Sequence, residues 1–266
     1  MIRTGIGGWT YPAWRGGAFY PARLRQADEQ TFATRAVRAI EINATFYRLQ
    51  KPESFAAWRE VAPPGFVYTL KGSRFVTNRK VLASAAEPLA RFFAQGLVEL
   101  GDALGPIVWQ LAATKRFEPD DVAAFLAMLP REHAGVPLRH AIEVGHESFA
   151  CAEFVAIARA ARVAIVYSEA DGRTVIADRS ADFAYLRLQR LDSGCPTGYP
   201  PAALSHLAEV CRAWSAGAAP EGLPYAGELA DSAGYAGDVF AMMINGAKVR
   251  APAAALALAE RVGETT

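Results

Sequence analysis

From Ala39 to Arg48 the chain reads A-I-E-I-N-A-T-F-Y-R. Ala39 and the two isoleucines indicate the end of a buried strand, yet Glu41 stands among them. A carboxylate that is buried without a cation or hydrogen bonds is costly, so we expect Glu41 to face other polar groups. The stretch therefore predicts a strand that ends at a polar site.

The same unit of a short apolar strand and a helix repeats on both sides of this stretch. The predicted strands are Ile2–Gly7, Ala39–Ile42, Phe66–Leu70, Ile107–Leu111, Arg139–Val144, Val163–Val166, Phe183–Leu188 and Asp238–Met243. The predicted helices are Glu29–Arg38, Pro52–Val61, Leu82–Leu104, Pro119–Leu129, Glu153–Ala161, Pro201–Trp214 and one that opens at Pro252. Strands that alternate with helices pair in parallel, and about 250 residues is usual for a (β/α)8 barrel. We therefore predict an α/β fold, a single TIM-type barrel over residues 1–266.

A doubly wound open sheet is the alternative fold. It would place a glycine-rich phosphate loop, G-x-G-x-x-G, between the first strand and its helix. The chain has Gly5-Ile6-Gly7-Gly8-Trp9 there, which does not match. Since no internal repeat or linker is visible either, one barrel domain is the preferred interpretation.

Composition restricts the classes of partner. Lys and Arg number 28 against 27 Asp and Glu, a net charge of +1, so no overall field attracts nucleic acid or an acidic membrane. The three cysteines, Cys151, Cys195 and Cys211, form neither a disulfide framework nor a C-x-x-C motif, which fits a reducing compartment. We see no signal peptide and no run of about 20 apolar residues, and so predict a cytoplasmic protein without membrane contact. The oligomeric state is left open.

Polar residues stand at the carboxyl ends of the predicted strands. In a barrel these ends meet at one mouth because all strands run in the same direction. The set is Trp9, Glu41, Asn43, Lys71, Gln110, Glu143, His146, Tyr167, Arg187, Gln189 and Asn245. Glu41 is expected to meet Lys71 from the next strand. A structural network that only ties loops down is the alternative interpretation, but buried charges in this number favour a functional site.

The loop after the last strand adds positive charge. It reads I-N-G-A-K-V-R-A-P, in which Lys248 and Arg250 precede the helix that opens at Pro252. Barrel enzymes frequently bind phosphate near the loops after strands seven and eight. We therefore predict a small anionic ligand, a sugar phosphate or a carboxylate, held by Arg187, Lys248 and Lys71. Glu41 or Glu143 would act as general base, with Asn43 and Gln110 orienting the ligand.

Two other functions stay open. The basic segment from Lys71 to Lys80 contains Arg74, and together with the aromatic residues Trp9 and Tyr11 it could bind single-stranded or distorted nucleic acid. The near-neutral charge makes this less favoured than a small anion. Tyr47 is expected to shape the loop after the second strand. A non-catalytic ligand sensor is the third alternative, and whether the chain is an enzyme is not decided by the sequence.

Metal and triad chemistry lack support. Glu41, Glu143 and His146 could hold one divalent ion, but no H-E-x-x-H or Cys/His spacing accompanies them, so we predict no metal site. His146 is better interpreted as a capping hydrogen bonder. No G-x-S-x-G motif supports a serine nucleophile, and no cofactor is indicated.

Several stretches together resemble the YecE-like family, known as domain of unknown function 72. They are G-G-W-T-Y-P-A-W-R-G, E-I-N-A-T-F-Y-R, P-P-G-F-V-Y-T-L-K-G-S-R, G-P-I-V-W-Q-L, H-A-I-E-V and Y-L-R-L. The resemblance covers nearly the whole chain and implies a (β/α)8 barrel, but it implies no activity, since fold does not give function. Relatives usually have arginine where this chain has Gly145, which puts the partner of Glu143 in doubt.

Overall fold

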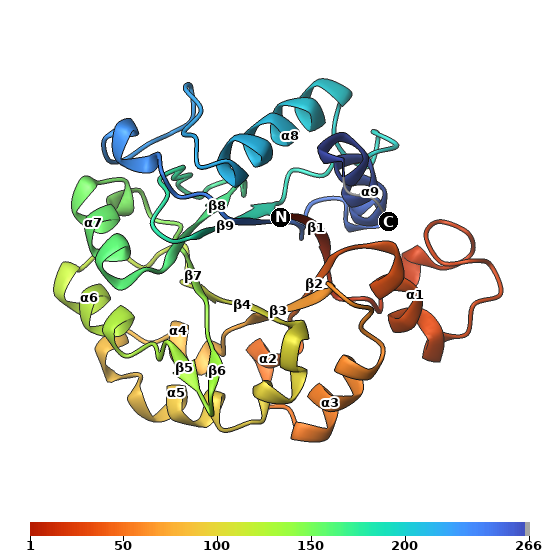
Figure 1. The fold of residues 1–266 in the computed structure, drawn as a ribbon, viewed down its shortest axis with the longest axis horizontal. Coiled ribbons are helices and arrows are strands. Elements are labelled where there is room, and N and C mark those ends of the chain that lie inside the picture. Colours follow the sequence, from red (N-terminus) through yellow and green to blue (C-terminus); the bar gives the residue numbers. More distant parts are fainter. Residues whose placement is uncertain (264–266) are drawn as a thin grey trace.

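The computed structural model describes residues 1–263 and shows a closed barrel of eight parallel strands (Figure 1). Around the barrel the order is β1-β10-β9-β8-β7-β4-β3-β2, and β1 is hydrogen-bonded to both β2 and β10. The strands are β1 (Ile2–Gly7), β2 (Ala39–Ile42), β3 (Val67–Lys71), β4 (Leu104–Gln110), β7 (His140–Glu143), β8 (Ala164–Ser168), β9 (Phe183–Leu188) and β10 (Asp238–Met243). The predicted fold class is confirmed.

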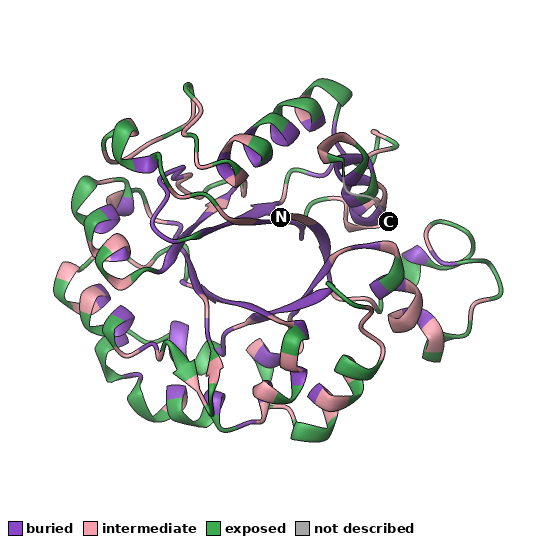
Figure 2. Cartoon of the chain, viewed as in Figure 1, coloured by how far each residue is buried: buried purple, intermediate pink, exposed green. Residues whose placement is uncertain are grey.

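Helices surround the barrel and turn their exposed faces outward (Figure 2). They are α1 (Glu29–Ala36), α2 (Ala44–Tyr47), α3 (Pro52–Glu60), α4 (Arg74–Thr77), α5 (Ala86–Phe93), α6 (Pro119–Ala127), α7 (Ala152–Ala161), α8 (Pro201–Ser215) and α9 (Ala251–Val262). Proline occupies the first turn of α3, α6, α8 and α9, where its missing N–H costs nothing.

Strand alternation sorts the side chains into two buried layers. One layer fills the space between barrel and helices, while Val67, Phe183, Phe240 and Met242 belong to a separate cluster formed by the alternate positions. Successive side chains of a strand point to opposite faces, so residues two apart share a face. The inward positions are apolar in the middle of the barrel and become polar toward the carboxyl ends of the strands. The polar residues that the sequence singled out therefore gather at the carboxyl end of the barrel.

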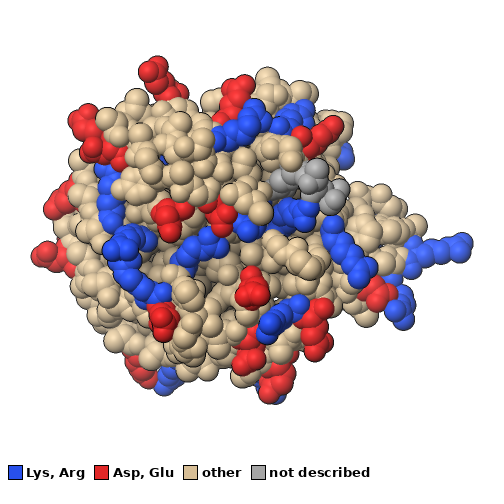
Figure 3. Space-filling view, viewed as in Figure 1, with Lys and Arg blue, Asp and Glu red and all other residues tan. Residues whose placement is uncertain are grey.

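The amino end of the barrel is closed by ion pairs. Asp238 contacts Arg3 and Arg139, each at 2.9 Å, and the amino group of Met1 at 3.2 Å. Burial opposes ionisation of Asp238, but these cations prevail and lower its pKa to about 2. On the face shown in Figure 3, basic side chains form a band with acidic ones on both sides. The charged groups at the amino end are thus paired with one another.

Some predicted elements have different bounds. The helix expected over Leu82–Leu104 is wrong beyond Phe93, because Gly96 and Gly101 adopt positive φ angles and residues 97–103 form 3-10 turns. A short antiparallel hairpin, β5 (Glu132–His133) and β6 (Val136–Pro137), was not expected. Within residues 1–263 no helix combines the length and apolar character that crossing a bilayer requires.

Candidate functional site

One arginine joins the two glutamates that the sequence singled out. Nη2 of Arg187 donates to Oε1 of Glu41 at 2.8 Å, and its Nε donates to Oε2 at 3.1 Å. The remaining nitrogen, Nη1, donates to Oε2 of Glu143. All three side chains are at most 1% exposed. Each of the three guanidinium nitrogens thus has a carboxylate partner inside the protein, as expected for a planar group with donors on two edges.

The positions of these residues follow from strand register. Gly7 is paired with Glu41, Gln110 with Glu143 and Ser168 with Arg187, all near the carboxyl ends of their strands. Tyr185 lies two residues before Arg187 on β9, so both point inward. Its hydroxyl donates to Oε2 of Glu41 at 2.9 Å. The sequence prediction missed Tyr185, although this two-residue spacing could have revealed it.

Glu143 is hydrogen-bonded on both oxygens. Ser168 donates to Oε1 at 2.7 Å, and Gln110 donates to Oε2 at 2.8 Å. Gln189 adds a longer contact of 3.3 Å and accepts a hydrogen bond from Asn245 at 2.8 Å. Five of the predicted residues therefore belong to one network with Arg187, and Ser168 is a further member that the prediction overlooked.

The pKa shifts within the network favour the charged form of each group. Burial alone would raise the pKa of Glu143, but Arg187 and then Arg173 outweigh it, so the pKa is lowered. Burial likewise opposes the charge of Arg187, yet Glu143 and Glu41 raise its pKa. The arrangement is an ionised carboxylate–guanidinium–carboxylate bridge whose polar atoms already have partners.

Two lysines beside this bridge are different. Within residues 1–263 the ammonium groups of Lys71 and Lys248 make neither a hydrogen bond nor an ion pair, whereas their backbone oxygens accept side-chain hydrogen bonds, from Thr45 and Trp14 respectively. The ammonium of Lys71 lies 4.2 Å from the centre of the Phe46 ring, and that of Lys248 lies 5.2 Å from the Tyr11 ring. Burial lowers the pKa of both, and Arg187 lowers that of Lys71 further, while Glu41 partly opposes the shift in each. Both amines are half-buried cations without an anionic contact.

Arg173 is a third cation that the sequence did not reveal. It lies in the connection between β8 and β9, and both terminal nitrogens are 3.5 Å from the carbonyl oxygen of Leu111. Its charge lowers the pKa of Glu143 and of Lys71. The doubt about a cation beside Glu143 is thereby resolved: Arg187 is the direct partner, and Arg173 adds a longer-range contribution.

The other predicted residues lie elsewhere. Trp9 packs edge-on against Trp58 and Tyr68, with ring centres 5.8 and 6.2 Å away, so it belongs to the packing near α3. Tyr47 is 59% exposed and Arg74 is exposed as well. Nδ1 of His146 accepts from the backbone N–H of Ser148 at 3.1 Å. The capping interpretation of His146 agrees with this contact.

Two contacts of the site differ from the predicted ones. Glu41 was expected to meet Lys71 from the neighbouring strand, but its hydrogen-bonded cation is Arg187, which reaches across the barrel. Asn43 is only 3.5 Å from the backbone oxygen of Glu41 and does not join the bridge. Tyr167 faces outward and packs 5.6 Å from Trp214, because β8 continues to Ser168.

The arrangement of donors bears on metal binding. Among residues 1–263 no three His, Cys, Asp or Glu side chains gather in a way that could hold an ion. Glu41 and Glu143 have Arg187 between them, and a cation placed there would meet a positive charge.

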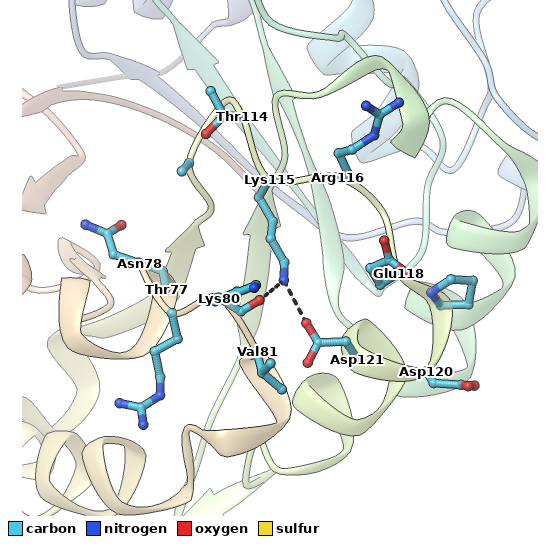
Figure 4. Close-up of a pocket in the computed structure, with 13 residues that line it drawn as sticks. Thr77, Asn78, Lys80, Val81, Thr114, Lys115, Arg116, Glu118, Asp120 and Asp121 are labelled. Carbon is cyan, nitrogen blue, oxygen red and sulfur yellow. Dashed lines mark hydrogen bonds and ion pairs between the residues drawn. The ribbon is translucent and has the colours of Figure 1, made fainter.

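A cavity of about 870 Å³ lies beside the mouth, between the loops after β3 and β4 (Figure 4). Two lysines line it, and one of them, Lys115, donates to the backbone oxygen of Lys80 at 2.6 Å and to Asp121 at 2.8 Å. The ammonium is thereby neutralised. None of the bridge residues lines this cavity, and its other basic side chains, Arg79, Lys80 and Arg116, are exposed to solvent. Cavity volume and half-buried unpaired charge therefore point to different places, and the half-buried charge is the better guide to an anion site.

Comparisons with known proteins agree with the fold. Residues 3–266 match the family model described as "Protein of unknown function DUF72". The UPF0759 protein YecE of Escherichia coli K12 is 30% identical over 144 residues, which are 53% of this chain and 49% of that protein. The chain thus spans about half the length of the curated relatives it matches.

Solved structures show the same architecture. A DUF72 family protein from Thermotoga maritima superposes with a TM-score of 0.75 at 20% identity, covering 99% of this chain and 100% of the other. One from Enterococcus faecalis gives 0.72 at 14% identity, covering 100% and 97%. A protein named SacUVDE gives 0.51 at 8% identity, covering 98% and 99%. At these identities the likeness concerns the fold alone.

Proposed function

Because the chain belongs to the DUF72 family, whose description names no activity, we propose its function from the site itself: the barrel mouth binds a small anionic ligand through Lys71 and Lys248. A single observation carries this proposal. Two half-buried ammonium groups stand beside the buried bridge, and neither has an anionic contact within residues 1–263. Burying a cation without a partner is unfavourable, so a ligand that supplies the anion is the natural complement.

The bridge positions the ligand rather than binding it. Arg187 was predicted to hold the anion, but it is 1% exposed and each of its three guanidinium nitrogens already donates to Glu41 or Glu143. Lys71 and Lys248 are therefore the binding cations, and the half-exposed amide of Gln110, which donates one N–H to Glu143, can donate its other N–H beside them. We assign Arg187 the role of fixing the two carboxylates. The charge of Glu41 in turn opposes the lowering of the lysine pKa values by burial, which favours the protonated form of both lysines.

Acid–base chemistry at this site would fall to Lys71. The lowered pKa of Glu143 makes it a weak base, and its oxygens are already hydrogen-bonded. Lys71 has a pKa lowered mainly by burial, so its amine loses a proton more readily than that of an exposed lysine. The predicted role of a glutamate as general base stays a prediction, and the proposal assigns the proton transfer to Lys71.

Substituting either lysine should abolish most of the binding. We expect Lys71→Met and Lys248→Met each to weaken the binding of inorganic phosphate about tenfold or more, because a charge-assisted contact contributes about 1.5–3 kcal/mol. Isothermal titration calorimetry at pH 7 and low salt measures this. Stability should not fall, since each substitution removes a desolvated charge that has no partner.

Lys51 offers a matched control because its side chain is exposed at the start of α3 and takes part in none of the hydrogen bonds described for the bridge. Lys51→Met should bind phosphate like the unmodified protein. If phosphate, sulfate and acetate all fail to bind the unmodified protein, the proposed site is wrong. Equal losses of phosphate affinity in the Lys71, Lys248 and Lys51 variants would indicate an effect of net charge alone and would also contradict the proposed site.

Nucleic-acid binding is the second candidate. Phe75 is 59% exposed beside the mouth, and the guanidinium of Arg74 lies 5.3 Å from its ring, so a base could stack there. An oligonucleotide titration at low salt tests this. Phosphate contacts predict binding that weakens steeply with salt, and Phe75→Ala with Arg74→Ala should remove it. Absence of binding at low salt would dismiss this function.

A further inference from the structure

We propose that the ligand carries two negative charges on one tetrahedral group, as a phosphate monoester does, and that Arg173 is the residue that selects this charge. The inference rests on the proposed function of the mouth and narrows it from any small anion to a dianion. It follows from a close approach between Arg173 and Gly145, and from the balance of charges around the bridge.

Gly145 leaves the space in which Arg173 lies. A Cβ atom at position 145 would stand 2.8 Å from Nη1 of Arg173 and 2.9 Å from Cα of Ala113. Both distances are shorter than real Cβ atoms show, so a larger residue would displace the guanidinium. The absence of a side chain therefore lets a distant loop deliver Arg173 next to the strand that ends in Glu143.

The guanidinium of Arg173 retains donors for a ligand. Its hydrogen bonds are the two long contacts of 3.5 Å to Leu111, and within residues 1–263 it has no carboxylate within 4 Å. A guanidinium presents several donors in a fixed plane, which matches the oxygens of a phosphoryl group. Arg173 can therefore bind an oxyanion. Arg187 is less suited to this, because each of its three guanidinium nitrogens already contacts a carboxylate.

The charges of the mouth are unequal. Arg187, Lys71, Lys248 and Arg173 are four cations against the two carboxylates of Glu41 and Glu143, an excess of two. Glu169 is left outside this count because its carboxylate accepts from the hydroxyl of Tyr199 at 3.0 Å and burial raises its pKa, which weakens its negative charge. A dianion neutralises the excess, whereas a monocarboxylate leaves one cation uncompensated.

Ethyl phosphate and ethyl sulfate form a matched pair of probes for this inference. They have the same tetrahedral shape, but ethyl phosphate is a dianion above pH of about 6 and ethyl sulfate is a monoanion throughout. Calorimetric titrations at pH 8 should show ethyl phosphate binding about tenfold or more tightly. At pH 5 the preference should largely disappear.

Arg173→Met should reduce the preference for ethyl phosphate to near unity while ethyl sulfate still binds. Arg116→Met is the control, an exposed arginine of the loop after β4, and it should retain the full preference. Equal affinity of the unmodified protein for both probes overturns the inference and leaves the anion site intact. An unchanged preference in Arg173→Met overturns the role of Arg173. If neither probe binds at all, the proposed function itself fails.

Discussion

Arg187→Met should destabilise the protein by about 3–5 kcal/mol at pH 7, the largest effect expected of any single substitution in the site. The variant leaves Glu41 and Glu143 buried without their shared cation. In the unmodified protein the lowered pKa of Glu143 contributes stability above its ordinary pKa that is lost as pH falls. In the variant burial acts without Arg187, so its pKa should rise and the stability deficit should shrink toward pH 4.5. Urea unfolding at both pH values measures the difference.

The controls separate charge from packing. Arg190 is 57% exposed on the same β9 end and pairs with an exposed aspartate, so Arg190→Met should change stability by less than about 0.5 kcal/mol. Adding Glu143→Gln to Arg187→Met should recover part of the loss, because one of the two stranded carboxylates is then neutral. A loss in Arg187→Met that is equal at pH 7 and pH 4.5 would mean that packing, not charge, explains it.

Replacing His140 should remove a second dependence of stability on pH, which lies in the range between about pH 6.5 and pH 4. His140 accepts from Nε1 of Trp109 at 3.2 Å through Nδ1 and lies 2.7 Å from the oxygen of Pro130 through Nε2, so the ring is neutral with its proton on Nε2. Burial lowers its pKa to about 4. The unfolded chain therefore binds a proton that the folded protein does not. Stability is full above pH 6.5 and should fall by about 1.4 kcal/mol for each unit down to about pH 4.

His140→Gln can keep both hydrogen bonds without titrating. We expect urea unfolding of this variant to be nearly independent of pH between 6.5 and 5, where carboxylates change little. His206→Gln is the control, since His206 is exposed on α8 and its substitution should leave the pH dependence of the unmodified protein. A His140→Gln variant with the original slope would show that another group is responsible.

The charged centre of the site could be predicted because its residues interrupt strands that are otherwise apolar. Glu41, Glu143 and Arg187 each interrupt an apolar strand, and such interruptions are visible without a structure. Their pairing was not visible. Adjacent strands suggested Lys71 as the partner of Glu41, whereas the longer planar side chain of Arg187 spans the barrel and satisfies both carboxylates at once.

The errors at the strand ends have a simple cause. A strand predicted to stop at Val166 made Tyr167 appear to face the mouth, but two further residues of β8 turn Tyr167 outward and Ser168 inward. Side-chain direction alternates with every residue, so the last inward position depends on where pairing stops. Arg173 was beyond prediction for another reason: it comes from an irregular connection, and only the space above Gly145 explains where it lies.

The layering of the barrel interior has an evolutionary consequence. The apolar middle, with Val67, Phe183 and Phe240, holds the strands together, while the two lysines proposed to bind the ligand, Lys71 and Lys248, stand at the end of β3 and in the loop after β10. Neither Lys71 nor Lys248 belongs to this apolar cluster. Mutation can therefore exchange those groups one at a time without threatening folding, so that specificity can diverge among descendants while the architecture stays the same.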